Sequence, residues 1–174
     1  PPVAAQSPAQ DAMSVNAGSG VLIPIQTKVF DLLIDDLDND GRQDITAIGH
    51  GANLAHIFYQ KTPRMFTDSQ IYHGVGFHPG NIIRWPGSTP SFILSAEGDN
   101  AIRTLLPDPQ GFRIESSRGE EAPRYANRFR WPGWGDSLIV TPYGRDEVIL
   151  LKDFDAKQGK AKQRVVVPLS DKRP

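Results

Sequence analysis

Cysteine is absent from this chain of 174 residues. Its absence excludes disulfide bonds, thiolate metal ligands, cysteine nucleophiles and covalent attachment of haem. Positive charge is not in excess either, because 19 Lys and Arg face 20 Asp and Glu, which gives a net charge of -1. Nucleic-acid-binding proteins neutralise phosphates with a basic surface, so this balance argues against a general nucleic-acid partner.

Long hydrophobic runs are also lacking. The longest, from Val21 to Ile25, is interrupted by Pro24 and is much shorter than the roughly 18 residues of a membrane-spanning helix. Residues 1–20 are rich in Pro, Ala, Gln and Ser, and they hold too little apolar surface to offset their ordering entropy, which predicts a flexible N-terminal segment. The chain begins without methionine, and we expect an exported protein, periplasmic or extracellular, that has lost a leader.

Helical periodicity is weak throughout the sequence. The 16 glycines and 15 prolines recur every few residues, and the apolar residues fall into short runs rich in β-branched side chains. Short runs of this kind, separated by turn residues, predict an all-β fold without alternating helices.

A repeat is visible within this pattern. Trp-Pro-Gly occurs at Trp85 and again at Trp131, about 46 positions later, each time between strand-like segments. The region before Trp85 has the same order of strands and turns. We therefore predict three units of about four strands each, which is the length and strand content of β-propeller blades. The predicted blades cover 28–73, 74–118 and 119–168 of a repeat domain at 21–174, and 21–27 is predicted to be the outer strand of a neighbouring blade.

Three blades cannot close a ring, because closed propellers have about four to eight. An open array leaves unpaired edges and apolar blade faces, which favour association. Three arrangements remain open: a fragment of a longer propeller, a subunit that completes one with other chains, or a wedge capped by a partner. The expected partners are therefore other protein subunits or the remaining blades.

The segment 36–44, with the sequence DLDNDGRQD, has the strongest chemical signal in the chain. Its carboxylates stand at loop positions 1, 3, 5 and 9, a spacing that suits Ca²⁺, a hard cation that takes about six to eight oxygen ligands. Glycine at position 6 permits a sharp turn. Arg42 at position 7 would offer its backbone carbonyl, with its side chain pointing outward. An EF-hand would need Glu at position 12, where this chain has Ala47 in a strand-like run.

The runs on both sides of the loop are strand-like, so we predict a calcium loop between two strands. The segment 30–45 resembles an FG-GAP/VCBS-type repeat, a family that builds β-propellers such as the heads of integrin alpha subunits and many exported bacterial proteins. The resemblance implies that Ca²⁺ is held by the side chains of Asp36, Asp38, Asp40 and Asp44 and by the main chain of Arg42. The segments that follow Trp85 and Trp131 lack the acidic loop, so one calcium site is expected.

Several other residues are weaker candidates. Trp85 and Trp131 are predicted to pack between blades, whereas Trp134, flanked by glycines, is the better candidate for an exposed contact with carbohydrate. His73 and His78 flank a glycine-rich linker and form a weak candidate pair for a transition metal. Arginines at positions 118, 124, 128 and 130 cluster near glutamates at 115, 120 and 121, which predicts a solvated face or a salt-bridged interface.

No sequence motif for a serine hydrolase, a zinc protease or a phosphate-binding loop occurs in the chain. The sequence therefore predicts a non-catalytic, calcium-stabilised structural or protein-interaction module of an exported protein. Two alternatives stay open: part of a propeller enzyme whose active site is completed by missing blades, and a lectin-like module that binds carbohydrate.

Overall fold

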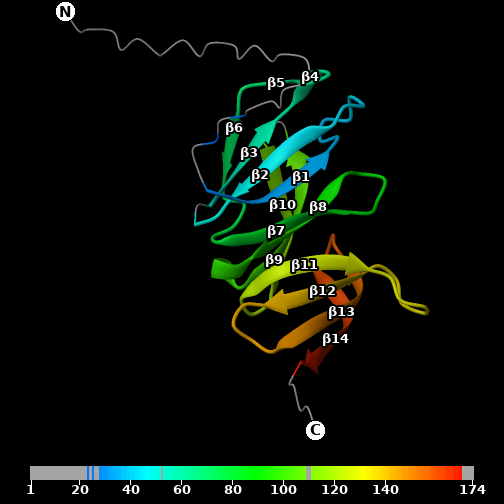
Figure 1. Cartoon of the computed structure of the whole chain (residues 1–174). Helices are drawn as coiled ribbons and strands as arrows, with labels where there is room; N and C mark the ends of the chain where they lie inside the picture. The colour runs from blue at the N-terminus through cyan, green and yellow to red at the C-terminus, as the bar shows by residue number, and fades with distance from the viewer. Residues whose placement is uncertain (1–22, 24, 26–27, 52, 109–110, 170–174) are drawn as a thin grey trace, which may run out of the picture.

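The computed structural model describes residues 23, 25, 28–51, 53–108 and 111–169 (Figure 1). Over these residues the fold is all-β, as predicted, with three four-stranded antiparallel sheets and one two-stranded sheet. The predicted N-terminal segment 1–20 and most of the predicted strand 21–27 lie outside the described residues. No helix able to cross a membrane occurs among the described residues.

The three larger sheets follow one another along the chain and along the long dimension of the molecule (Figure 1). The sheets cover residues 29–73, 79–119 and 123–168. The units predicted from the sequence were 28–73, 74–118 and 119–168. Sheet 1 contains β1 (Val29–Asp35), β2 (Asp44–Gly49), β3 (Leu54–Phe58) and β6 (Gln70–His73), with the small hairpin β4 (Gln60–Thr62) and β5 (Met65–Phe66) inserted before its last strand. Sheet 2 contains β7 (Pro79–Trp85), β8 (Ser91–Ala96), β9 (Ala101–Asp108) and β10 (Gly111–Gly119), with a 3-10 turn, η1 (Glu97–Asp99), between β8 and β9. Sheet 3 contains β11 (Pro123–Phe129), β12 (Ser137–Pro142), β13 (Glu147–Asp155) and β14 (Lys160–Pro168).

The inner strand β8 of sheet 2 is buried on both faces. All six residues of β8 are buried, and successive side chains of a strand point to opposite faces of its sheet. Phe92 and Leu94 therefore pack toward sheet 1, while Ile93 packs toward sheet 3. The sequence of β8 reads as a continuous apolar run for this reason, as expected for a strand covered on both sides.

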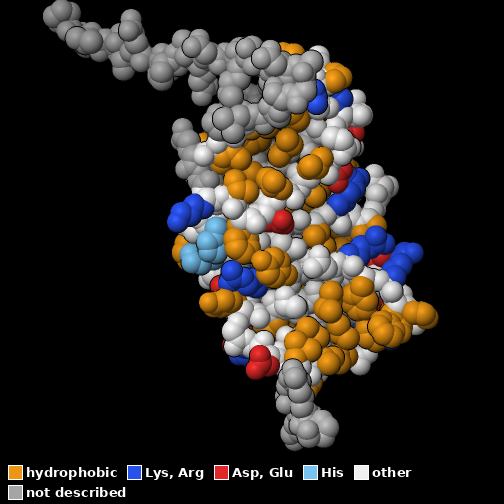
Figure 2. All heavy atoms as spheres, in the orientation of Figure 1, with side chains coloured by type: hydrophobic (Ala, Val, Ile, Leu, Met, Phe, Trp, Pro, Cys, Tyr) orange, Lys and Arg blue, Asp and Glu red, His pale blue; other side chains and the backbone are white. Residues whose placement is uncertain are grey.

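Two hydrophobic cores result from this arrangement. The core between sheets 1 and 2 includes Ile48, Ala55, Ile57, Phe92, Leu94 and Leu105. The core between sheets 2 and 3 includes Trp85, Ile93, Ile102, Leu138, Val140, Ile149, Leu151 and Phe154. Other hydrophobic side chains remain on the surface (Figure 2).

The prediction that both repeated tryptophans pack between sheets is right for Trp85 and wrong for Trp131. Trp85 is buried and packs edge-on against Phe154, with ring centroids 5.5 Å apart. Trp131 lies beyond the end of β11 and is 64% exposed. The strand register explains the difference, because Trp85 pairs with the first residue of β8, whereas Phe129 pairs with the first residue of β12. Phe129 thus occupies the position of Trp85 in sheet 3.

The first strands of the three sheets, β1, β7 and β11, lie side by side in that order. Each is the edge of its own sheet, so half of its backbone N–H groups have no partner within that sheet. At each of the two junctions, a side chain of the preceding sheet supplies an acceptor for one such group. Asp31 Oδ2 accepts the N–H of Ile82 at 2.9 Å, and Asn81 Oδ1 accepts the N–H of Ala126 at 2.8 Å.

The two contacts are equivalent in register. Ile82 and Ala126 each pair with the fourth residue of the second strand in their own sheets, and so does Leu32 in sheet 1. The acceptor in each case is the residue just before the equivalent position in the preceding sheet. In sheet 3 that place is held by Tyr125, which stacks back on Phe30 of sheet 1 at 6.1 Å between ring centroids.

Asn81 forms the more extensive of the two contacts. Its Nδ2 donates to the Ala126 carbonyl at 3.0 Å, and its Oδ1 also accepts from the Ser95 hydroxyl at 2.9 Å. Close approach of the backbones permits this, since a Cβ on Gly80 would lie 1.7 Å from the carbonyl oxygen of Arg124. Only glycine fits at this crossing of β7 and β11.

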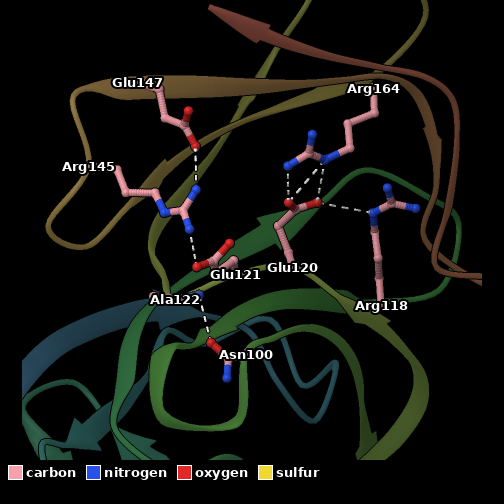
Figure 3. Close-up of polar contacts among 8 residues, drawn as sticks. All are labelled: Asn100, Arg118, Glu120, Glu121, Ala122, Arg145, Glu147 and Arg164. Atoms are coloured by element: carbon pink, nitrogen blue, oxygen red, sulfur yellow. Dashed lines mark hydrogen bonds and ion pairs between the residues drawn. The ribbon is translucent and has the colours of Figure 1, made fainter. Parts of the chain in front are cut away.

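The connection between sheets 2 and 3 is held by a polar cluster (Figure 3). The buried Glu120 carboxylate accepts from Arg164 of β14, with Nη2 to Oε1 at 2.7 Å, and lies 3.6 Å from Arg118 Nε. Asn100 Oδ1 accepts the N–H of Ala122 at 2.8 Å. Arginines and glutamates of this region therefore form a salt-bridged interface inside the chain. This is one of the two arrangements predicted from the sequence, the other being a solvated face.

Substitution of Asn81 tests the contact between sheets 2 and 3. Asn81→Ala leaves the N–H and carbonyl of Ala126 and the Ser95 hydroxyl without this partner, so we expect a loss of about 2–4 kcal/mol in the free energy of unfolding. Urea denaturation measures it. The matched control is Asn127→Ala at an exposed position of β11, expected to change stability by less than about 0.5 kcal/mol. Equal effects of the two substitutions would refute the role given to Asn81.

Candidate metal centre

The acidic loop connects β1 to β2 in sheet 1, between two strands as predicted. One apolar residue anchors it, because Leu37 is 3% exposed and belongs to the core between sheets 1 and 2. The alternation of acidic residues with Leu37 therefore has a packing reason: the polar side chains on either side of it are held at the surface.

The loop is wound by hydrogen bonds from its backbone to its own carboxylates. Asp36 accepts the N–H groups of Asp40 and Gly41, at 3.1 and 2.9 Å, and Asp40 accepts that of Arg42 at 2.8 Å. Gly41 has a φ of +85°, a left-handed conformation that glycine adopts at little cost. The turn that the glycine at position 6 was expected to allow is thus present.

Three carboxylates converge in this loop. Oxygen atoms of Asp36, Asp38 and Asp40 all lie within 4.8 Å of one another. Calcium–oxygen distances are about 2.3–2.6 Å, so oxygens on opposite sides of one ion are about 5 Å apart. The spacing and the hard oxygen donors therefore fit a Ca²⁺ ion. Among the described residues this is the one cluster of three or more side chains that meets this geometry.

Asp44, the fourth predicted carboxylate ligand, lies outside that cluster of three. It is fully buried, and its Oδ2 and Oδ1 accept the N–H groups of Leu37 and Gln60, both at 2.9 Å. Asp44 therefore fastens the start of the loop to β2 and to the strand that follows β3.

Burial raises the pKa of the Asp44 carboxyl above its ordinary value; the two backbone hydrogen bonds oppose the shift, and the nearby charges of Asp38 and Asp40 add to it. A raised pKa means that the folded chain takes up this proton more readily than the unfolded chain. The contribution of Asp44 to stability therefore falls as the pH rises from about 3.8 through its folded-state pKa.

The Arg42 side chain is exposed and lies along the edge of the loop. Its guanidinium pairs with the Asp40 carboxylate, and its Nε donates to the Gln60 carbonyl at 2.7 Å. The arginine thus offsets one of the three converging negative charges from the edge of the loop.

The other predicted site residues are distributed over the molecule. His78 lies near His50, with ring centroids 5.0 Å apart, while His73 ends β6. Trp134 is half-buried beneath the Lys152 ammonium, which lies 4.7 Å from the ring centroid, so Trp131 is the more exposed of the two indoles.

A pocket lined by arginines lies between β7 and β11 and was not predicted from the sequence. An arginine directly precedes the tryptophan in both copies of the repeat, as Arg84-Trp85 and Arg130-Trp131, and this was the signal available. Structure was needed to show that Arg84, Arg128 and Arg130 line one pocket.

Comparisons of this chain with protein-family models, with curated proteins and with solved structures find no match. The FG-GAP/VCBS resemblance of residues 30–45 therefore stays a prediction.

Replacement of Asp44 tests its role as the anchor of the loop. Asp44→Asn puts an NH₂ group, which cannot accept a hydrogen bond, opposite one of the two backbone N–H donors. We therefore expect the variant to have a free energy of unfolding about 1–3 kcal/mol lower than that of the unaltered chain. The measurement is made at pH 7 in EDTA, so that no ion contributes. Asp38→Asn, at an exposed position of the same loop, serves as the control and should change stability by less than about 0.5 kcal/mol. A loss as large in the control would contradict the anchoring role.

Proposed function

We propose that this chain is a non-catalytic, calcium-stabilised module of an exported protein, whose three sheets act as blades of a propeller-type array and contact other protein subunits or further blades. The observation that carries the proposal is the convergence of Asp36, Asp38 and Asp40 in the loop between the first two strands of sheet 1. Three carboxylates at this distance repel one another, so the loop favours binding of a cation.

Calcium would be held by the side chains of Asp36, Asp38 and Asp40 and by the main-chain carbonyl of Arg42. Asp44 can join them while it anchors the loop, because each carboxylate oxygen has two lone-pair directions and the backbone amides use one of them. The ion supplies positive charge where three carboxylates otherwise repel one another. Through Leu37 and Asp44 that stabilisation extends to the core of sheets 1 and 2.

The exposure of the loop supports the export part of the proposal. Asp38 and Asp40 are exposed, and Arg42 competes with the ion for Asp40. An exposed site with this competition suits a compartment rich in calcium, since extracellular modules bind Ca²⁺ with dissociation constants of about 10⁻⁴–10⁻³ M.

The blade part is supported by the repetition of one plan. Each sheet begins at an edge strand that lies beside the edge strand of the next sheet, and the same side-chain-to-backbone contact links both pairs of neighbours. Sheet 1 also keeps an apolar surface on its far side. Leu32 and Ile34 are 55% and 62% exposed and alternate with Leu33, which packs toward sheet 2. Such a face supports contact with a further blade or a partner subunit.

Calcium removal tests the proposed function. Binding at about 100 times the dissociation constant stabilises the folded state by about 2.7 kcal/mol, which for a chain of this size raises Tm by about 5–10 °C. We expect EDTA to lower Tm and Ca²⁺ to restore it at equal ionic strength, with one ion bound per chain by isothermal titration calorimetry.

Two variants make the test specific. Asp36→Asn should abolish the Ca²⁺-dependent rise in Tm, and Asp68→Asn, at an exposed position outside the loop, should preserve it. Mg²⁺ should not replace Ca²⁺, because it demands near-octahedral geometry and gives up its water reluctantly. A melting temperature that is the same with EDTA and with excess Ca²⁺ would overturn the calcium-dependent role.

A further inference from the structure

An open pocket of about 390 Å³ lies between the ends of β7 and β11. Its volume is within the range of about 300–1,000 Å³ that ligand sites occupy in proteins. The residues that line it are Ile83, Arg84, Asn127, Arg128, Phe129 and Arg130. Half of its lining residues are therefore arginines, in a chain whose overall charge is slightly negative.

Aspartates hold these arginines in place. Asp136 Oδ1 accepts from Nε of Arg128 at 2.7 Å and from Nε of Arg130 at 3.0 Å, and its Oδ2 accepts from Nη2 of Arg130 at 3.2 Å. Arg84 pairs with Asp35 at the end of β1. Partial burial alone would raise the pKa of Asp136, but hydrogen bonds from Arg130 and Arg128 outweigh it, so the pKa lies below its ordinary value and the carboxylate stays ionised.

The ion pairs leave binding capacity in the pocket. Three guanidinium groups face two carboxylates, so one positive charge remains uncompensated within the group. The bonds to Asp136 use Nε and Nη2 of Arg128 and Arg130, which leaves the Nη1 groups outside this ion pair. Arginines held in a fixed orientation lose little entropy when they bind an oxyanion, and their planar donors match carboxylate or sulfate oxygens.

A row of aromatic rings leads from the pocket to the surface. Phe129 lines the pocket and lies 5.9 Å from Trp134, which lies 6.4 Å from Trp131, measured between ring centroids. Trp131 is 64% exposed, the highest value among the three tryptophans. Basic and hydrophobic side chains lie next to each other at the edge of the molecule where β11 ends (Figures 1 and 2).

We propose that this pocket and the adjoining row of Phe129, Trp134 and Trp131 bind an acidic oligosaccharide, with a carboxylate or sulfate at Arg128 and Arg130 and the flat apolar face of a neighbouring sugar on Trp131. The ligand must carry both features. A simple anion would make no contact with the exposed indole of Trp131. A neutral sugar would not compensate the excess positive charge of the arginines. Single-stranded nucleic acid also combines phosphate with stacking bases, but it requires an extended basic groove, and the chain has no excess of positive charge.

Binding is measured by tryptophan fluorescence and isothermal titration calorimetry with four hexameric probes: an oligogalacturonate, a sulfated oligosaccharide of the heparin type, neutral maltohexaose and a single-stranded oligonucleotide. The intact chain is used with Ca²⁺ present. We expect at least one of the two acidic sugars to bind and maltohexaose not to bind. The comparison between uronate and sulfate identifies which anionic group the arginines prefer, and binding should weaken as salt screens the charge.

Variants are chosen at exposed positions so that folding is preserved. Arg130 is 70% exposed at its side chain, and Arg130→Ala leaves Arg128 to pair with Asp136. We expect Arg130→Ala and Trp131→Ala each to raise the dissociation constant at least about tenfold. The matched controls lie at the opposite end of β12. Arg145→Ala removes a comparable ion-paired arginine and Tyr143→Ala a comparably exposed ring, and both should bind as the unaltered chain does.

Four results would overturn the inference. They are tighter binding of the oligonucleotide than of either acidic sugar, equal binding of maltohexaose, a loss in Arg145→Ala as large as in Arg130→Ala, and no binding of either acidic sugar at millimolar concentration. The inference does not depend on the calcium site, so an absent calcium response and an absent sugar response are separate outcomes. Unchanged Tm values for the variants show that any loss of binding is local.

Discussion

The architecture depends on how the edge strands β7 and β11 satisfy their outward backbone amides. An edge strand in contact with another sheet leaves N–H groups that water cannot reach, and each such group is costly if it has no acceptor. Asp31 and Asn81 provide that acceptor across the two junctions. Because both side chains are short, the sheets must approach closely, and Gly80 permits this at the junction of sheets 2 and 3. The apolar cores lie between the same pairs of sheets.

The acidic loop is linked to that framework rather than attached to its surface. Leu37 places one side chain of the loop in the core, and Asp44 holds the backbone on both sides of it. The position of the three converging carboxylates is therefore determined mainly by buried contacts. A change in charge at the loop acts on β1 and β2, and β1 is the strand that supplies Asp31 to sheet 2. The loop and the junction between sheets 1 and 2 are therefore connected through β1.

Much of the fold could be predicted from the sequence because strand and turn chemistry are local. The short β-branched runs and the Gly and Pro pattern predicted an all-β chain, and the acidic loop was placed between two strands, as observed. The convergence of Asp36, Asp38 and Asp40 follows from their alternation around a left-handed glycine. The buried role of Asp44 could not be predicted from the same pattern, because it depends on the amide of Gln60, which is supplied by another strand.

Features that depend on the pairing register between strands could not be predicted from the sequence. The second Trp-Pro-Gly has the same letters as the first, yet β11 pairs with β12 in a register that puts Phe129, not Trp131, at the position of Trp85. The shift releases Trp131 to the surface and brings Arg128 and Arg130 alongside Arg84. A motif repeated in sequence is thus not repeated in space, and the difference generates the pocket.

Tyr125 stands in sheet 3 where Asp31 and Asn81 stand in the other two sheets, and this gives the array a polarity. Its hydroxyl lies beyond an aromatic ring that is turned back onto Phe30, so it cannot accept an adjacent backbone amide in the way that a short carboxylate or carboxamide does. Sheet 3 therefore does not offer at this position the acceptor that sheets 1 and 2 offer. The contact runs in one direction through the three sheets, from Asp31 to sheet 2 and from Asn81 to sheet 3.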